Sequence, residues 1–247
     1  MQRGREVLAA LGVPADAWYV GLHVREGSYY GESSGGMSTH RNAQIEEYVP
    51  AIKAITDRGG YVIRLGDSSM RPLPEMPGVL DYALSAHKSS QADIFFCATS
   101  RFIIGTTSGL TTAALSFGTP MLLVNCISND WQLWSPETDF IVKPVWDIRG
   151  KRALSLAETY SQPVQGYLIN ALVMRRRGLE AIPNTPHEIE SAVVYKLARL
   201  DGEIEADADP LMDSYREAMA GNPMMFGAAR PVLLFLNEHP ELLVSGA

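Results

Sequence analysis

The sequence has no long apolar run, no excess of basic residues and only two cysteines, and each absence excludes a class of protein. No apolar run approaches the roughly 20 residues that a membrane-spanning helix requires. Acidic residues (28) outnumber basic ones (21), and the net charge of −7 argues against a nucleic-acid-binding protein. Cys97 and Cys126 both lie in apolar segments. We therefore expect reduced core thiols, a cytoplasmic location and no zinc site.

The composition is that of a globular protein. The chain has 247 residues, of which 46% are hydrophobic and 20% are charged, so it is long enough to bury a sizeable core. The first 18 residues, MQRGREVLAALGVPADAW, predict an amphipathic helix. They do not predict a signal peptide, because the apolar block is short and no cleavage pattern follows it.

Short apolar runs alternate with helix-like segments in the first half of the chain. Strands are predicted over residues 18–24, 61–65, 79–84, 102–104 and 121–124. Helices are predicted over residues 45–58 and 89–98 and from residue 109 onward. This alternation is typical of a doubly wound, mostly parallel α/β sheet. We predict a Rossmann-like domain over residues 1–148, to which the resemblance described below adds the binding of a nucleotide sugar.

The second half is predicted to be a mainly helical extension, over residues 149–247. Its helices are expected over residues 155–160, 164–177, 186–200, 210–220 and 228–238. Three consecutive arginines, residues 175–177, precede Gly178. This order is typical of a helix C-terminus, where cations complement the helix dipole.

One segment, RFIIGTTSGLTTAALSFGTPMLLVN from Arg101 to Asn125, predicts a strand, a tight loop, a helix and a second strand. The loop holds two glycines and three hydroxyl side chains, and the first turn of the helix has no acid, although acids are usual there. Such a loop binds phosphate through N–H groups, hydroxyls and the helix dipole. The alternative is a plain turn.

In a doubly wound sheet, ligands bind at the carboxyl ends of the strands. The predicted strand ends supply the candidate binding residues His23, Arg25, Arg64, Gly66, Asp67, Asp81, Tyr82, Gly105, Thr106, Thr107, Ser108 and Gly109. Arg25 would provide the bidentate guanidinium that suits a diphosphate. The alternatives are a core histidine at His23 and a structural ion pair between Arg64 and either Asp67 or Asp81.

Five segments carry a resemblance to a known family: GLHVREGSYYGE, HRNAQIEEYVPAI, GGYVIRLGD, PGVLDYALS and ADIFFCATSRFIIGTTSGLTTAALSFGTPMLLVN. In this order they resemble predicted bacterial glycosyltransferases whose members sometimes occur beside tetratricopeptide repeats. The resemblance runs from about Leu8 to Asp201. The chain is also distantly similar to the fucosyltransferase superfamily, in which a His-x-Arg motif follows the first strand of the nucleotide-sugar domain.

The resemblance implies a GT-B-type donor domain that transfers a sugar from a nucleoside-diphosphate sugar. His23 and Arg25 match the His-x-Arg motif, so Arg25 would hold the diphosphate. Asp81 stands near the position of an acid that reads the nucleobase, and residues 106–108 match a hydroxyl-rich phosphate loop. Glu26 and Gly27 depart from the Arg and acid that follow in many fucosyltransferases, which leaves the identity of the donor open.

GT-B enzymes also carry an acceptor domain before this unit, and little precedes the first strand here. We therefore expect the donor-binding half of an enzyme, a truncated enzyme, or a chain whose partner supplies the acceptor domain. The acceptor, whether a glycan, a lipid-linked molecule, a protein or a small molecule, stays open.

The expected reaction needs neither metal nor cofactor, because Arg25 and the helix N-terminus would stabilise the leaving diphosphate. A base must deprotonate the acceptor. Glu26, Glu32 and His40 lie on or near the loop of residues 24–42, and the choice among them stays open. Arg41 and Asn42 are further binding candidates, with a helix start as the alternative. The Asp207-Ala208-Asp209 sequence imitates a metal motif but lies in an acidic linker.

Two other functions compete with sugar transfer. The first is a non-catalytic module for nucleotide-sugar binding or assembly. The second is an α/β hydrolase, because Gly105-x-Thr107-x-Gly109 has the spacing of a nucleophile elbow with Thr in place of Ser. A hydrolase would need His187 and a downstream acid, either Asp139 or Asp147.

Overall fold

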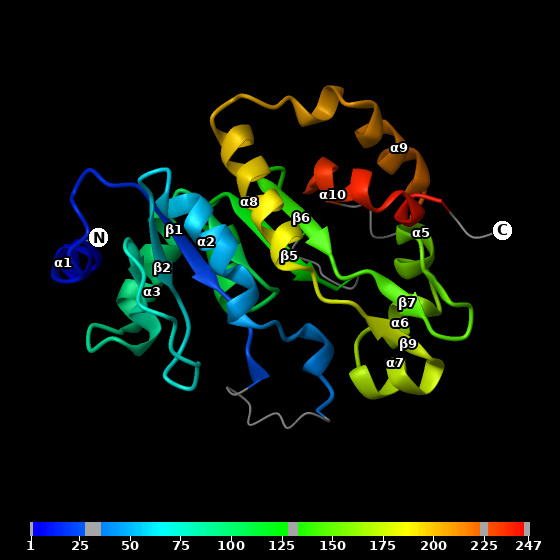
Figure 1. The fold of residues 1–247 in the computed structure, drawn as a ribbon, viewed down its shortest axis with the longest axis horizontal. Coiled ribbons are helices and arrows are strands. Elements are labelled where there is room, and N and C mark those ends of the chain that lie inside the picture. Colours follow the sequence, from blue (N-terminus) through cyan, green and yellow to red (C-terminus); the bar gives the residue numbers. More distant parts are fainter. Residues whose placement is uncertain (1, 28–35, 128–132, 223–226, 245–247) are drawn as a thin grey trace.

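A parallel sheet of seven strands forms the centre of the molecule (Figure 1). The computed structural model describes residues 2–27, 36–127, 133–222 and 227–244. The strands are β1 (Tyr19–His23), β2 (Tyr61–Arg64), β3 (Val79–Leu80), β4 (Ile103–Gly105), β5 (Met121–Cys126), β6 (Thr138–Val142) and β10 (Arg230–Pro231). Their order is β10-β6-β5-β4-β1-β2-β3, and every pair is parallel.

This order contains the 3-2-1-4-5-6 arrangement of a doubly wound sheet, with β10 added at one edge. The direction of winding reverses between β1 and β4, which lie side by side. A doubly wound sheet leaves a crevice at such a point, where ligands bind. The sequence segments that end in Arg25 and in Gly109 therefore meet at this position.

Helices cover both faces of the sheet, so its central strands are buried and read as almost continuous apolar runs. On one face, α2 (Val49–Thr56) packs beside α8 (Pro186–Leu200) (Figure 1). On the other face, α3 (Ser90–Thr99) packs against α1 (Gln2–Ala10) and α4 (Gly109–Ser116). Nothing among the described helices has the length and apolarity to cross a bilayer.

Residues 145–182 form a separate small lobe, at the lower right of Figure 1. Its antiparallel sheet consists of β7 (Val145–Asp147), β8 (Arg152–Ala153) and β9 (Leu179–Ala181). Three short helices complete it, α5 (Leu156–Thr159), α6 (Val164–Tyr167) and α7 (Ala171–Arg177). The lobe has its own apolar cluster, which includes Val145, Leu168 and Met174.

After the lobe the chain returns to the large sheet. Helix α8 packs on α2, α9 (Pro210–Ala218) follows, and α10 (Leu233–Glu238) packs against α8 and α9. The 3-10 helices are η2 (Thr39–Arg41), η3 (Ile45–Tyr48), η4 (Tyr82–Leu84), η5 (Ala206–Ala208) and η6 (Pro240–Leu242). The domain boundary predicted at residue 148 stays a prediction. Helix α8 packs on α2 and β10 pairs with β6, so elements after this boundary contact elements before it.

The α/β class and the mostly parallel sheet are confirmed, and several details of the prediction are wrong. The predicted strand 79–84 stops at Leu80, because Tyr82 turns into the core and packs edge-on against Phe96 at 4.8 Å. The helix predicted over 164–177 is two helices, because the Asn170 side chain accepts the Leu172 N–H and starts α7. Strands β6 through β10 were not predicted.

Candidate functional site

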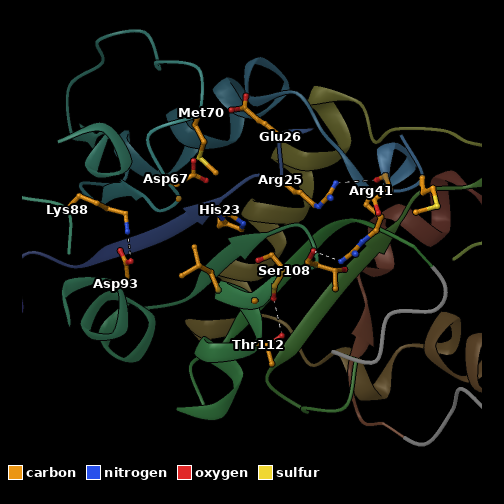
Figure 2. A pocket seen from close by; sticks show the side chains of 16 residues that line it. His23, Arg25, Glu26, Arg41, Asp67, Met70, Lys88, Asp93, Ser108 and Thr112 are labelled. Atoms are coloured by element: carbon orange, nitrogen blue, oxygen red, sulfur yellow. Dashed lines mark hydrogen bonds and ion pairs between the residues drawn. The ribbon is translucent and has the colours of Figure 1, made fainter. Parts of the chain in front are cut away.

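A pocket of about 1010 Å³ lies at the carboxyl ends of β1, β2 and β4 (Figure 2). Nine residues predicted from the sequence line it: His23, Arg25, Glu26, Arg41, Gly66, Asp67, Thr107, Ser108 and Gly109. The sequence reasoning missed the other lining residues, Met37, Ser38, Met70, Lys88, Asp93, Leu110 and Thr112. The pocket thus occupies the crevice expected where the winding of the sheet reverses.

The loops after β1 and β4 are tied to each other by short hydrogen bonds. The Thr106 N–H donates to the His23 carbonyl over 3.1 Å, and the Arg25 N–H donates to Thr106 Oγ1 over 2.8 Å. A Cβ at Gly105 would lie 2.5 Å from Thr111 Cγ2 and 3.2 Å from the His23 oxygen. Glycine is therefore required at this position for the two loops to approach, and Gly105 and Thr106 support the pocket without lining it.

Two guanidinium groups lie at the pocket, each fixed by carbonyl or amide oxygens. Arg25 Nη1 donates to the Ser38 carbonyl over 3.2 Å and to Asn42 Oδ1. Arg41 Nη2 donates to the Thr107 carbonyl over 3.0 Å. The predicted candidate Asn42 therefore orients Arg25 and does not line the pocket. These contacts hold both guanidinium groups at the edge of the pocket, which both residues line.

The N-terminus of α4 faces the same pocket, with part of its donors already used. Ser108 Oγ accepts the Thr111 N–H over 3.3 Å, while Thr111 Oγ1 accepts the Ser108 N–H over 2.9 Å. The first turn of α4 has no acid in part because two hydroxyl side chains, those of Ser108 and Thr111, form its capping box. Within the described ranges, the N–H groups of Thr107, Gly109 and Leu110 have no hydrogen-bond partner.

A buried lysine, Lys143, binds the backbone on either side of Arg41. Lys143 follows β6, is 3% exposed, and its Nζ donates to the carbonyls of His40 (3.0 Å) and Asn42 (2.6 Å). Burial is the main cause that lowers the pKa of Lys143 to about 8; the negative charge of Glu47 opposes this shift, and the positive charge of Arg25 adds to it. The sequence signal was a single lysine directly after an apolar run, FIVK, which the sequence reasoning passed over.

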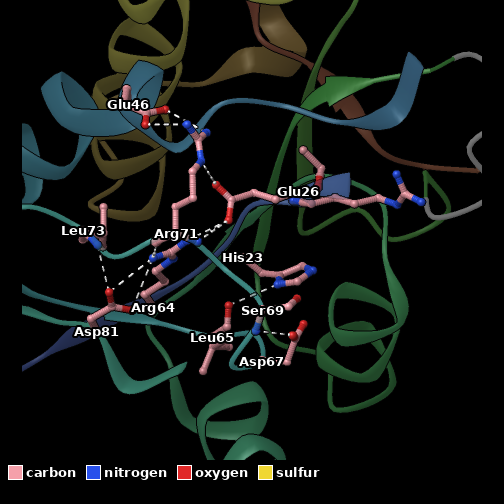
Figure 3. Close-up of polar contacts among 12 residues, drawn as sticks. His23, Glu26, Glu46, Arg64, Leu65, Asp67, Ser69, Arg71, Leu73 and Asp81 are labelled. Atoms are coloured by element: carbon pink, nitrogen blue, oxygen red, sulfur yellow. Dashed lines mark hydrogen bonds and ion pairs between the residues drawn. The ribbon is translucent and has the colours of Figure 1, made fainter. Parts of the chain in front are cut away.

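A network of charged side chains centred on Glu26 lies beside the pocket (Figure 3). Glu26 Oε2 accepts from Arg64 Nη2 over 3.2 Å and from the Arg71 N–H over 3.1 Å, and Oε1 accepts from Arg71 Nε over 3.3 Å. Arg64 is fully buried and also contacts Asp81 Oδ2 at 3.3 Å. The structural ion pair is thus the correct interpretation of Arg64, with Glu26 and Asp81 as its partners.

Asp81 and Tyr82 do not line the pocket, contrary to the prediction. Asp81 also accepts the Leu73 N–H over 2.9 Å, which holds the 66–73 segment. The Tyr82 hydroxyl donates to the Ser89 carbonyl over 3.0 Å, and burial raises the pKa of Tyr82 to about 12. The polar atoms of both residues are therefore used in contacts within the fold.

The three candidate bases have different surroundings. Both oxygens of Glu26 accept hydrogen bonds from arginine, although the residue lines the pocket. His40 is not a lining residue, and burial lowers its pKa to about 4. Glu32 lies outside the described residues.

His23 is a further titratable group in the pocket. Its Nδ1 lies 3.2 Å from the Leu65 carbonyl, and burial lowers its pKa. A neutral ring that donates from Nδ1 presents Nε2 as an acceptor.

The residues of the rival sites take part in other contacts. Asp207 pairs with Arg216 and Arg230 at 2.7 and 2.6 Å. Asp209 accepts the Leu211 N–H at the start of α9. His187 lies 3.7 Å from Glu238. In the part of the chain that the structure describes, no three His, Cys, Asp or Glu residues gather as metal ligands.

No family model, curated protein or solved structure matches the chain.

Proposed function

We propose that the protein is a glycosyltransferase, or the donor-binding half of one, that uses a nucleoside-diphosphate sugar. One observation carries the proposal. Two guanidinium groups, from Arg25 and Arg41, border a single pocket where the sheet reverses its winding. The N–H groups of Thr107, Gly109 and Leu110, which have no hydrogen-bond partner among the described residues, border the same pocket. Guanidinium and helix N-terminal N–H groups are the donors that a diphosphate requires. The motif resemblance points to the same ligand.

In the proposed reaction, an acceptor oxygen forms a bond to the anomeric carbon while the bond to the diphosphate breaks. Negative charge then grows on the departing diphosphate, which the two arginines and the α4 N-terminus would stabilise. The acceptor proton passes to a base. Because these fixed donors can carry the leaving charge, we propose that the reaction is independent of metal. An acceptor domain from a partner chain fits this proposal.

The test is a thermal-shift screen against UDP, GDP, ADP, CMP and their sugars, followed by calorimetry with the best compound. We expect one nucleoside diphosphate to stabilise the protein, and we expect its affinity to survive excess EDTA. If none of the compounds binds, the proposal is wrong. If binding is lost in EDTA and returns with manganese or magnesium, the metal-independent mechanism is wrong.

A second candidate function, a binding or assembly module without catalysis, is favoured by the surroundings of the candidate bases. Glu26 is held by Arg64 and Arg71, and His40 lies outside the lining. Mass spectrometry of the donor after long incubation separates the two functions. Release of the free sugar or its transfer supports the enzyme, whereas an intact donor at saturating protein supports the module.

The hydrolase is the weakest candidate. Asp139, one acid that it would need, binds Lys196 and Arg199, and His187 pairs with Glu238. Asp147 accepts the Arg149 N–H over 3.0 Å. An active-site serine probe should therefore label nothing. Labelling at Thr107 would instead support the hydrolase function.

A further inference from the structure

The small lobe differs in charge from the rest of the chain. Residues 145–182 hold six basic and three acidic residues, a net charge of +3. Because the whole chain carries −7, the remaining residues together carry −10. A local excess of positive charge on an acidic protein is the electrostatic signature of a surface that meets an anionic partner.

Most of these basic residues gather at one end of the lobe. The Ile148 N–H donates to the Gly178 carbonyl over 2.9 Å and so joins the turn after β7 to the end of α7. The turn and the helix bring together Arg149, Lys151, Arg175, Arg176 and Arg177. We call these five residues the basic end of the lobe.

The basic end is exposed, and its charge is largely unpaired. Arg177 stacks over Tyr167 at 4.7 Å. The other four cations make no ion pair with any residue that the structure describes. A helix C-terminus carries about half a negative charge, so helix capping accounts for only a fraction of this positive charge.

Exposed aliphatic side chains lie next to the basic end. Ile169 and Leu172 are 65% and 39% exposed. Leu172, Arg175 and Arg176 have the i, i+3, i+4 spacing that places them on one face of α7, and Ile169 precedes them by one turn. Aliphatic side chains beside arginines are typical of a helix that lies at a membrane interface. They are not needed for contact with nucleic acid, whose binding depends on phosphate contacts.

We propose that the basic end and the exposed face of α7 dock the small lobe on an anionic lipid surface. Figure 1 shows α7 on the outside of the lobe, below β9. The Ala171 N–H donates to the Met37 carbonyl over 2.8 Å, and Met37 lines the pocket. Docking therefore brings the pocket near the lipid surface. Only the further step, presentation of a lipid-linked acceptor at the pocket, rests on the proposed function.

The test is cosedimentation of the full chain, without nucleotide, with two kinds of vesicle: phosphatidylcholine alone, and equimolar phosphatidylcholine and phosphatidylglycerol. We expect binding to the anionic vesicles only, weakened by salt. The double variant Arg175→Glu/Arg176→Glu should partition at least about tenfold more weakly. The matched control, Arg3→Glu/Lys53→Glu, changes the total charge equally on exposed residues of α1 and α2, and should bind as the parent does.

Three results would overturn the proposal: no sedimentation of the parent with anionic vesicles, an equal loss in the control, or binding to RNA without binding to vesicles. A second variant, Ile169→Ser/Leu172→Ser, should weaken the part of vesicle binding that persists at high salt. If the arginine variant unfolds, Lys151→Glu in the turn replaces it. Nucleotide affinity and melting temperature of the same variants should match the parent, which separates this proposal from the proposed function.

Discussion

Strand β6 has a buried lysine at each end, and the two lysines have different partners. At the amino end, Lys196 of α8 is fully buried and donates to Asp139 Oδ2 over 2.7 Å and to the Glu137 carbonyl over 2.8 Å. Arg199 binds the other oxygen of Asp139. At the carboxyl end, Lys143 donates to two carbonyls, and no described carboxylate lies within ion-pair distance of it.

The difference separates a structural cluster from a functional one. At the amino edge, the opposite charge of Asp139 compensates Lys196, and the cluster joins α8 to the sheet. At the carboxyl edge, positive charge is held by carbonyl dipoles and adds to that of Arg25 and Arg41 beside the pocket. An anion entering the pocket would supply the missing negative charge. Variants of the amino edge should therefore affect stability, and variants of the carboxyl edge should affect binding.

The largest effect is expected for Asp139→Ala. This change leaves Lys196 buried without its acid, which should lower the free energy of unfolding by about 3–5 kcal/mol. Urea denaturation measures it, and nucleotide affinity of the folded variant should not change. Asp57→Ala is the control, because Asp57 pairs with Lys53 on the surface, where such pairs contribute less than about 1 kcal/mol. Similar losses in both variants would contradict the structural role of the Asp139 cluster.

Arg25→Lys should weaken binding of the nucleoside diphosphate by about 1–3 kcal/mol, because lysine keeps the charge but loses the bidentate fork. Calorimetry measures the affinity, and urea denaturation should show little change in stability. Arg58→Lys, in the turn that follows α2, serves as the matched control. Unchanged affinity in Arg25→Lys would remove Arg25 from the binding site.

Gly109→Asp tests the N-terminus of α4. A Cβ at Gly109 meets nothing within 4 Å, so the side chain fits, and its charge near the helix N-terminus favours folding by about 0.3–1 kcal/mol. The same charge should repel a diphosphate and weaken binding by at least about 1 kcal/mol. Melting temperature and nucleotide affinity are measured together. If the variant folds and binds the nucleotide with parental affinity, the loop of residues 105–109 is a plain turn without a role in binding.

The last prediction concerns Lys143 and the dependence of stability on pH. Burial lowers its pKa from the ordinary 10.5 to about 8. Below pH 8 both the folded and the unfolded states carry the charge, and the cost of burying it is present in full. Between the two pKa values only the unfolded state keeps the proton, so the free energy of unfolding should rise with pH by about 1 kcal/mol per unit.

The variant Lys143→Met lacks this titration. Urea denaturation of parent and variant at several pH values isolates the difference between them. A difference that stays constant from pH 7 to about pH 10 would mean that the buried ammonium keeps an ordinary pKa.

The sequence predicted those parts of the site that depend on local pattern. The loop of residues 105–109 lies between an apolar strand and a helix, and Arg25 directly follows a strand, so both could be placed at the carboxyl edge. Helix α8 begins and ends where it was predicted, because Thr185 and Glu188 form a capping box around Pro186.

The parts of the fold and of the site that the sequence did not predict depend on contacts between residues far apart in the chain. Arg64 and Glu26 are 38 positions apart, and no local pattern indicates that they pair. Likewise, Lys143 contacts carbonyls about 100 positions away. The strand β10 has only two residues, too few to show a period, and its place at the edge follows from pairing with β6.

Both edges of the large sheet are short. The edge strands β3 and β10 each have two residues, and one residue of β10 is Pro231, which has no N–H. A row of unpaired backbone donors and acceptors is what allows a second chain to extend a sheet, and natural proteins shorten such rows to prevent fibril-like association. The sheet therefore limits its own growth at both sides, and the apolar central strands stay out of reach of neighbouring molecules in a concentrated solution.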